Sequence, residues 1–229
     1  MSGYRCPHGR HNGTMCTFNL PNSLERILDA IRRAGGHPLI VGGAVRDAAI
    51  GVPSKDFDIE VYELDVDPLT EALMTVGKVN QVGKSFGVLK VSTSGLEVDI
   101  SLPRRESKVG RGHKGFVVVP DASMTPKAAA SRRDFTINAI AFDPGTGELL
   151  DFFDGLQDLK NGILRHTSAA FADDPLRVLR GMQLAGRFRL RAASATVELS
   201  RELFDEYDTL AIERVWAEWY KWAAKSAQP

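Results

Sequence analysis

Residues 41–60 read V-G-G-A-V-R-D-A-A-I-G-V-P-S-K-D-F-D-I-E, and this stretch decides the fold. The apolar residues 39–41 predict a buried strand, after which Gly42 and Gly43 predict a tight turn into a short helix. Backbone N–H groups at a glycine turn and a helix N-terminus carry partial positive charge and suit a triphosphate. We therefore expect Gly42, Gly43 and Arg46 to contact a triphosphate.

Two carboxylates follow this predicted helix. A second strand is predicted over residues 57–62, with Asp56 just before it and Asp58 within it. Because side chains two residues apart point to the same face of a strand, both carboxylates are expected on one face of the sheet. Paired carboxylates suit two hard divalent cations held against phosphate oxygens. An isolated Asp-x-Asp pair is more often part of a solvated strand edge. Joined to the preceding Gly-Gly, the pattern resembles the nucleotidyltransferase superfamily that includes DNA polymerase beta.

Composition allows a sizeable core but gives no support to a nucleic-acid partner. The chain has 229 residues, 43% of them hydrophobic, and 29 basic residues balance 29 acidic ones. The hydrophobic content is sufficient for a core in one or two domains. Because the net charge is zero, any attraction of RNA would have to come from local basic patches. The sequence predicts no membrane span and no signal peptide. Two cysteines argue against a disulfide scaffold, so we expect a cytoplasmic protein.

Residues 1–21 are predicted to be a flexible leader. This leader contains four side chains of the kinds that bind zinc: Cys6, His8, His11 and Cys16. Their spacing matches no common zinc finger, and a Cys-x-x-Cys pair is absent from the sequence. Zinc binding therefore stays an open alternative to a plain leader.

The remaining chain predicts an α+β head domain, residues 22–167, and an all-helical neck domain, residues 168–229. Apolar residues at helical spacing predict helices over 22–34 and 68–76. Further β-like segments are 79–82, 86–92, 96–102, 136–142, 149–153 and 163–166. Together they predict a mixed sheet with helices on one face.

The last predicted helix, residues 212–224, carries four aromatic side chains: Trp216, Trp219, Tyr220 and Trp222. Such a run is able to stack on bases. Packing between helices is the more common role, and we expect it here.

A second dense motif, R-R-D-F-T-I-N-A, occupies residues 132–139. Arginine neutralises phosphate charge with fixed bidentate geometry, so Arg132 and Arg133 are both candidates to bind phosphate. Asp134 and Asn138 are suited to bond a ribose hydroxyl, which would select ribonucleotides. Taken alone, the motif also fits a basic turn before a strand.

A third motif, A-D-D-P-L-R-V-L-R, occupies residues 172–180. Pro175 suits the first turn of a helix that Asp174 caps. Asp174, Arg177 and Arg180 step by three and are expected roughly along one face. An Asp–Arg pair is able to mimic a base edge, because the carboxylate accepts and the guanidinium donates. The alternative is an ordinary capped helix with a surface ion pair.

In this order the three motifs resemble class II tRNA nucleotidyltransferases, the family of bacterial-type CCA-adding enzymes and bacterial poly(A) polymerase. The resemblance covers about residues 38–222, including the segments 82–88, 110–116 and 151–158. It implies that Asp56 and Asp58 are the catalytic residues that bind two Mg²⁺ ions. The implied ribose-recognition residues are Arg133, Asp134 and Asn138, and the implied template for CTP and ATP is Asp173, Asp174 and Arg177.

Two departures from the family pattern stand out. The template begins with Asp173, where the family has Glu. Enzymes of this family also continue into helical body and tail domains that hold tRNA, whereas this sequence ends soon after Trp222. The chain is either a head-and-neck fragment or a compact variant, and its oligomeric state is left open.

Two further features are weaker. The segment 104–114 contains five basic residues and one acidic residue, with Gly110 and Gly112, and is interpreted as a mobile basic loop. Its position matches a flexible loop that the family uses in switching from CTP to ATP; a solvated hairpin is the alternative. Asp99 is placed to be a third carboxylate beside Asp56 and Asp58.

The expected activity is template-independent addition of C and A to the tRNA 3′ end. Within the same chemistry, the alternatives are poly(A) synthesis, or addition of CC or A alone. A non-catalytic module that binds nucleotides or RNA is the alternative from a different class.

Overall fold

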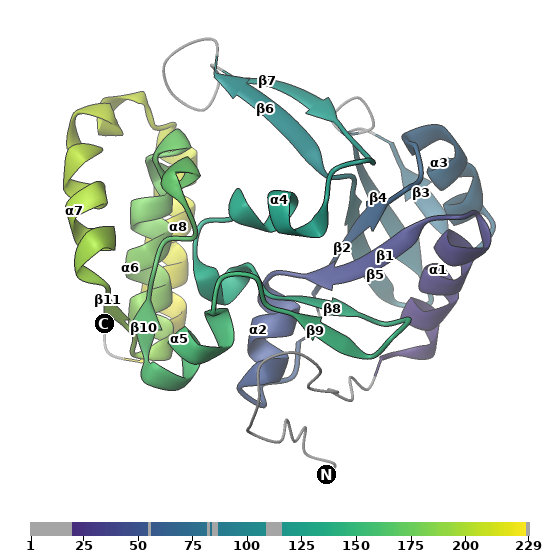
Figure 1. Cartoon of the computed structure of the whole chain (residues 1–229), viewed down its shortest axis with the longest axis horizontal. Helices are drawn as coiled ribbons and strands as arrows, with labels where there is room; N and C mark the ends of the chain where they lie inside the picture. Colours follow the sequence, from purple (N-terminus) through teal and green to yellow (C-terminus); the bar gives the residue numbers. More distant parts are fainter. Residues whose placement is uncertain (1–19, 55, 82, 84–86, 109–115, 228–229) are drawn as a thin grey trace. The chain divides into compact units, whose positions relative to one another are not determined.

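A mixed sheet of seven strands lies at the centre of the first of two compact units (Figure 1). The structure, a computed structural model, describes residues 20–54, 56–81, 83, 87–108 and 116–227. Strand order is β3-β4-β5-β2-β1-β8-β9, and the only parallel neighbours within this described sheet are β2 and β5. The strands are β1 (His37–Val41), β2 (Phe57–Tyr62), β3 (Lys78–Asn80), β4 (Val88–Thr93), β5 (Leu96–Ser101), β8 (Ala141–Asp143) and β9 (Glu148–Leu150). The predicted mixed sheet is confirmed.

Three helices belong to the same unit: α1 (Asn22–Arg33), α2 (Gly43–Ala49) and α3 (Val66–Met74). α1 buries Leu24, Ile27 and Ile31 at the three- and four-residue spacing that predicted it. It contacts α3 and β1, while α2 contacts β1 and β2. α2 therefore lies where the glycine turn and the second strand of the opening motif meet.

The second unit is mainly helical and has its own core. Its helices are α5 (Gly155–Asn161), α6 (Leu176–Phe188), α7 (Ser194–Glu202) and α8 (Ile212–Lys225), with 3₁₀ turns η2 (Thr136–Asn138), η3 (Ala169–Asp173) and η4 (Phe204–Thr209). Two short parallel strands, β10 (Ile163–Leu164) and β11 (Arg191–Ala192), also belong to this unit, as do residues 106–108 and 116–117. Phe135 and Phe171 are fully buried, and their rings meet edge to face at 5.4 Å. No helix in the described part of the chain is long and apolar enough to cross a bilayer.

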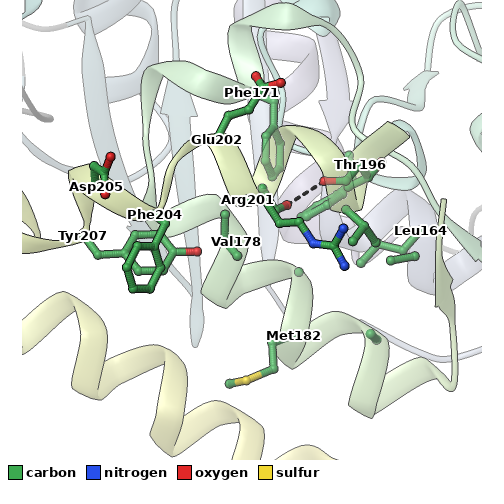
Figure 2. A pocket seen from close by; sticks show the side chains of 16 residues that line it. Leu164, Phe171, Val178, Met182, Thr196, Arg201, Glu202, Phe204, Asp205 and Tyr207 are labelled. Carbon is green, nitrogen blue, oxygen red and sulfur yellow. Dashed lines mark hydrogen bonds between the residues drawn. The ribbon is translucent and has the colours of Figure 1, made fainter. Parts of the chain in front are cut away.

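A cavity of about 770 Å³ opens into this helical unit (Figure 2). Helix α6 supplies Val178 and Met182 to its wall, and Phe171 lies at its apolar interior. α7 and η4 add both apolar and polar groups, among them Phe204, Glu202 and Asp205. The mainly apolar lining distinguishes this cavity from a site for a phosphate-bearing ligand.

The predicted strand over residues 136–142 is wrong in its first half. Residues Thr136–Asn138 form the turn η2, and the strand β8 begins at Ala141. The side chains explain the difference, because the Thr136 hydroxyl donates to Asp158 at 2.7 Å and the Asn138 amide donates to Asp134 at 3.0 Å. The Phe135 backbone N–H also donates to Asp134 Oδ1 at 2.8 Å, and local side-chain-to-backbone bonds of this kind compete with the ladder of a sheet.

The predicted loop over 104–114 begins as a strand instead. Strand β6 (Arg104–Lys108) pairs with β7 (Phe116–Pro120) in a separate two-stranded sheet. The Arg105 guanidinium bonds the Asp121 carboxylate at 2.5 Å, which ties the start of β6 to the residue after β7. Residues 109–114 lie outside the described residues, as do the four leader side chains considered for zinc.

The boundaries between the two compact units differ from the predicted head–neck boundary at residue 168. The segment 130–139, which carries the second motif, groups with the helical unit, as do residues 152–167. Helix α4 (Pro126–Ser131) contributes residues to both units. A boundary at residue 168 stays a prediction from the sequence.

Gly181→Ala is expected to destabilise the helical unit, although alanine is usually favoured over glycine within a helix. A Cβ at position 181 would lie 2.8 Å from Cζ of Phe135. Alanine normally gains about 1 kcal/mol over glycine in a helix, whereas overpacking typically costs about 1–3 kcal/mol. Urea denaturation should therefore show a net loss of about 1 kcal/mol. In a Phe135→Leu background, which lacks Cζ, the same substitution should become neutral or stabilising; an equal loss in both backgrounds would contradict the contact.

Candidate nucleotide-transfer site

Strand β2 places the two predicted catalytic carboxylates on the surface of the sheet unit. Phe57 and Ile59 are buried, while Asp58 between them is exposed, as is Asp56 just before the strand. This alternation is what the pleat of a strand requires, so the shared orientation follows from the two-residue spacing. The exposure of both residues agrees with the predicted arrangement, and their role as metal ligands stays a prediction.

Asp99 lies beside Asp58 on the neighbouring strand. In the parallel pairing of β2 and β5, Asp58 is the register partner of Asp99, and both side chains are exposed. Three carboxylates, Asp56, Asp58 and Asp99, thus share one side of the sheet, and we call this set the carboxylate face. The sequence predicted Asp99 as a third carboxylate. Its position beside Asp58 depends on the parallel pairing of β2 and β5, which local sequence patterns do not predict.

Lys90 is a member of this region that the sequence did not identify. It is the cross-strand partner of Asp99 on β4, and its Nζ lies 3.2 Å from Asp99 Oδ1. The hydrogen bond and the charge of Asp99 raise the pKa of Lys90, so the amine stays a cation. Lys90 therefore adds a positive charge beside the carboxylate face, at a site where phosphate groups would also be attracted.

The donor chemistry of Asp56 and Asp58 fits a divalent cation. Carboxylate oxygens are hard ligands, and Mg²⁺ in proteins commonly takes one or two carboxylates and completes its shell with water and substrate phosphates. Among the described residues, no three His, Cys, Asp or Glu side chains come close enough together to hold a metal ion. The pair thus fits a cation that is shared with a phosphate substrate better than one held by protein groups alone.

The glycine turn of the opening motif precedes α2 as predicted. Gly42 has φ +73° and ψ −135°, a conformation that residues with a Cβ rarely adopt, and α2 begins at Gly43. Arg46 lies differently from expectation: it is 5% exposed, and its Nε and Nη2 donate to Asp47 Oδ1 at 2.9 and 2.6 Å. The guanidinium thus bonds a neighbour on its own helix, and its contact with a triphosphate stays a prediction.

Five side chains of the second and third motifs lie in the helical unit, and we call them the recognition cluster: Asp134, Asn138, Asp174, Arg177 and Arg180. The predicted phosphate ligand Arg133 is half-buried and directly precedes Asp134.

Asp134 is the most buried charge of the recognition cluster. It is 7% exposed, and Oδ1 accepts from the Phe135 backbone N–H at 2.8 Å and from Asn138 Nδ2 at 3.0 Å. Oδ2 accepts from Arg180 Nε at 2.9 Å and lies 2.8 Å from Arg180 Nη2. Burial by itself would raise the pKa of Asp134, but the Arg180 charge and these hydrogen bonds outweigh it and lower the pKa.

A carboxylate has about four lone-pair sites, and in Asp134 four donors occupy them. The geometry therefore favours Asp134 as the group that holds Asn138, which is itself buried. A direct contact between Asp134 and a ribose stays a prediction.

Asp174 and Arg177 have different partners, although the sequence predicted that they would act as a pair. Asp174 caps α6 by accepting from the Leu176 backbone N–H at 3.1 Å, as expected. Arg177 instead donates to the backbone oxygens of Ala170 at 2.6 Å and Arg132 at 2.9 Å. These bonds therefore give no support to the predicted alignment of the two side chains along one face of the helix.

Helix α8 supplies two charged groups that sequence reasoning missed. Arg214 Nη2 lies 2.7 Å from Asp174 Oδ2. Glu218 is 3% exposed, and its Oε1 lies 2.7 Å from Lys221 Nζ and 3.9 Å from Arg180 Nη1. The signal in the sequence was the four-residue spacing of Arg214 and Glu218, which places both on one face of a helix.

The aromatic run of α8 corrects the expectation of helix packing. Trp216 and Tyr220 are 70% and 66% exposed, and Trp219 is 43% exposed. Trp222, by contrast, is half-buried, and its ring meets that of Trp219 edge to face. The helix thus turns Glu218 inward and most of its aromatic surface outward, which periodicity of apolar residues alone would not predict.

Arg180→Met should destabilise the protein at pH 7, because it leaves a buried carboxylate without its cation. Since the Arg180 side chain is 41% exposed, we expect about 2 kcal/mol, below the ~3–5 kcal/mol for a fully buried pair. Wild-type Asp134, with its lowered pKa, contributes stability above the ordinary pKa of 3.8 and loses it as the pH falls below that value. In the variant, burial raises the pKa, so protonation relieves the unpaired charge. Urea denaturation should therefore show a difference between the two proteins that shrinks from pH 7 to pH 4.5. The exposed Arg191→Met is the control, and a pH-independent difference would contradict the pairing.

Known proteins are similar to this chain over most of its length. The "Multifunctional CCA protein" of Xanthomonas campestris pv. campestris (strain B100) is 44% identical over 195 residues, which are 83% of this chain and 46% of that protein. A CCA-adding enzyme in complex with CTP has a TM-score of 0.73 at 27% identity, covering 90% of this chain and 48% of its own. The Thermotoga maritima CCA-adding enzyme complexed with tRNA-CCA has a TM-score of 0.72 at 29% identity, covering 89% and 47%. The chain spans about half the length of these proteins.

A family model matches the part of the chain that carries the first two motifs. Residues 39–165, more than half of the sequence, match the poly A polymerase head domain. The matched residues include the glycine turn, the carboxylate face and the motif at 132–139. Sequence motifs, the arrangement of the sheet and this match agree, and the chain belongs to the poly A polymerase head domain family.

Proposed function

We propose that this chain adds C and A residues from CTP and ATP to the 3′ end of tRNA, without a template, by nucleotidyl transfer. The observation that carries the proposal is the carboxylate face, in which Asp56 and Asp58 share one side of β2 and Asp99 is the register partner of Asp58. The similarity to CCA-adding enzymes that bind CTP and tRNA supports the choice of substrates. Action in the cytoplasm belongs to the same proposal.

In the proposed reaction the tRNA 3′-hydroxyl oxygen forms a bond to the α-phosphorus, and the bond from that phosphorus to the bridging oxygen breaks, releasing pyrophosphate. Asp56 and Asp58 would hold two Mg²⁺ ions. When bound, such ions supply positive charge that lowers the pKa of the hydroxyl and stabilises the leaving phosphates. Asp99 would accept the hydroxyl proton, and the backbone amides at Gly42 and Gly43 would bind the triphosphate.

Base and sugar would be selected by the recognition cluster. The Asp174 carboxylate would accept from the exocyclic amine of cytosine or adenine, where uracil and guanine present oxygen. Within the described residues, the Leu176 N–H and both Nη groups of Arg214 bond this carboxylate, which leaves about one of its four lone-pair sites for a base. Asn138, held by Asp134, would contact the ribose, and Arg133 a phosphate.

Poly(A) synthesis is the second candidate, favoured by the match to the poly A polymerase head domain. It would appear as extension of unstructured RNA with ATP alone. Addition of CC or of A alone would appear as arrest after two cytidines, or after one adenosine. A non-catalytic binding module would bind CTP and ATP without Mg²⁺-dependent turnover.

Asp58→Asn should reduce transfer of labelled CMP to a tRNA lacking CCA by at least ~10³-fold, because a neutral amide is a poor ligand for a divalent cation. Thermal unfolding should change little, since residue 58 is exposed. Glu97→Gln, an exposed change on β5, is the matched control and should retain activity. Normal transfer by a folded Asp58→Asn protein would refute the assignment of the metal ligands.

Asp174→Ala and Arg177→Ala should relax the choice among the four nucleoside triphosphates. Loss of one hydrogen bond to a base is worth about 1 kcal/mol, or about fivefold in preference. The measurement is the ratio of transfer rates for CTP over UTP and for ATP over GTP, each nucleotide supplied alone. Unchanged ratios in both variants would rule out an amino-acid template at these positions.

A further inference from the structure

Helix α8 reaches the recognition cluster at two points one helical turn apart. Arg214 and Glu218 are four residues apart and contact different members of the cluster. All of these residues belong to the helical unit. The two contacts are therefore made by different side chains of one helix to different members of the cluster.

The first connection runs to the group proposed to recognise the base. Arg214 Nη2 lies 2.7 Å from Asp174 Oδ2, and Nη1 lies 3.5 Å from Oδ1. The same carboxylate accepts from the Leu176 N–H, so one donor on α8 and one on α6 fix its plane. Arg214 therefore determines the direction in which the remaining lone pairs of Asp174 point.

The second connection runs to the groups proposed to recognise the sugar. Glu218 lies 3.9 Å from Arg180 Nη1, while the other edge of that guanidinium bonds Asp134, which in turn accepts from Asn138. Glu218 is nearly fully buried, and within the described residues its Oε2 has no hydrogen-bond partner. A buried carboxylate that is incompletely bonded costs stability. The presence of such a group at position 218 therefore favours a role for Glu218 beyond packing.

We propose that Arg214 and Glu218 are positioning residues that act on substrate choice separately: Arg214 on the base through Asp174, and Glu218 on the sugar through Arg180, Asp134 and Asn138. The inference rests on the proposed function. A purely structural role for α8 would instead weaken both kinds of selection together, because loosening the helix would disturb the whole cluster.

Four variants test the separation: Arg214→Gln and Glu218→Gln remove the charges, Arg214→Lys restores a cation, and Glu213→Gln is an exposed matched control on the same helix. For each, kcat/KM is measured on a tRNA lacking CCA with CTP, UTP and dCTP. Binding of the same nucleotides is measured by titration calorimetry, and folding by thermal denaturation.

Arg214→Gln should lower the CTP/UTP ratio about fivefold and leave the CTP/dCTP ratio within about twofold, because one hydrogen bond of modest strength is lost. Glu218→Gln should do the reverse. Arg214→Lys should recover part of the base preference, since a point charge replaces a planar fork. Glu213→Gln should match wild type in both ratios.

Equal loss of both ratios in either variant, or unchanged ratios in both, would overturn the inference while leaving the proposed function intact. If Glu218→Gln does not fold, Arg180→Lys tests the same connection, and an unchanged CTP/dCTP ratio there would also overturn it. If wild type transfers no nucleotide, the proposed function fails, and the ratios of binding constants decide the inference instead. Wild-type binding without discrimination would overturn both.

Discussion

Asp134 is a carboxylate in the interior of the helical unit, and a buried charge has to be balanced where it lies. Arg180 supplies the opposite charge, and backbone and amide donors occupy the other oxygen. This requirement connects α6 to the turn that contains Asn138, and through Glu218 it connects both to α8. The second motif, the third motif and the last helix are thereby joined by one set of charges.

The sheet unit depends on a different constraint, the register of two parallel strands. Because β2 and β5 run side by side, Asp58 and Asp99 must occupy neighbouring positions on the same face. Antiparallel pairing of β4 with β5 then adds Lys90 next to Asp99. A group of acidic residues beside a cation therefore follows from backbone hydrogen bonding, and it suits a metal ion that is shared with a phosphate substrate.

Much of the sheet could be predicted, because strand β2 and the Gly-Gly turn are determined by local patterns that tertiary contacts did not change. The shared face of Asp56 and Asp58 needed only the two-residue period of a strand. Lys90 could not be found this way, since its place depends on strand order. The ion pair of Asp174 with Arg214 could not be predicted either, because Arg214 lies 40 residues further along the chain. Likewise, the burial of Glu218 on α8, with Trp216 and Tyr220 left exposed, depends on tertiary contacts such as that with Arg180.

Extension of a tRNA transcript that ends before CCA tests the central claim most directly. The full chain would be supplied with Mg²⁺ and with CTP, ATP or both, and the products resolved at single-nucleotide length. The account predicts addition of two cytidines with CTP alone, and of C-C-A followed by arrest when both nucleotides are present. No extension under any of these conditions, by a folded protein that still binds CTP and ATP, would contradict it.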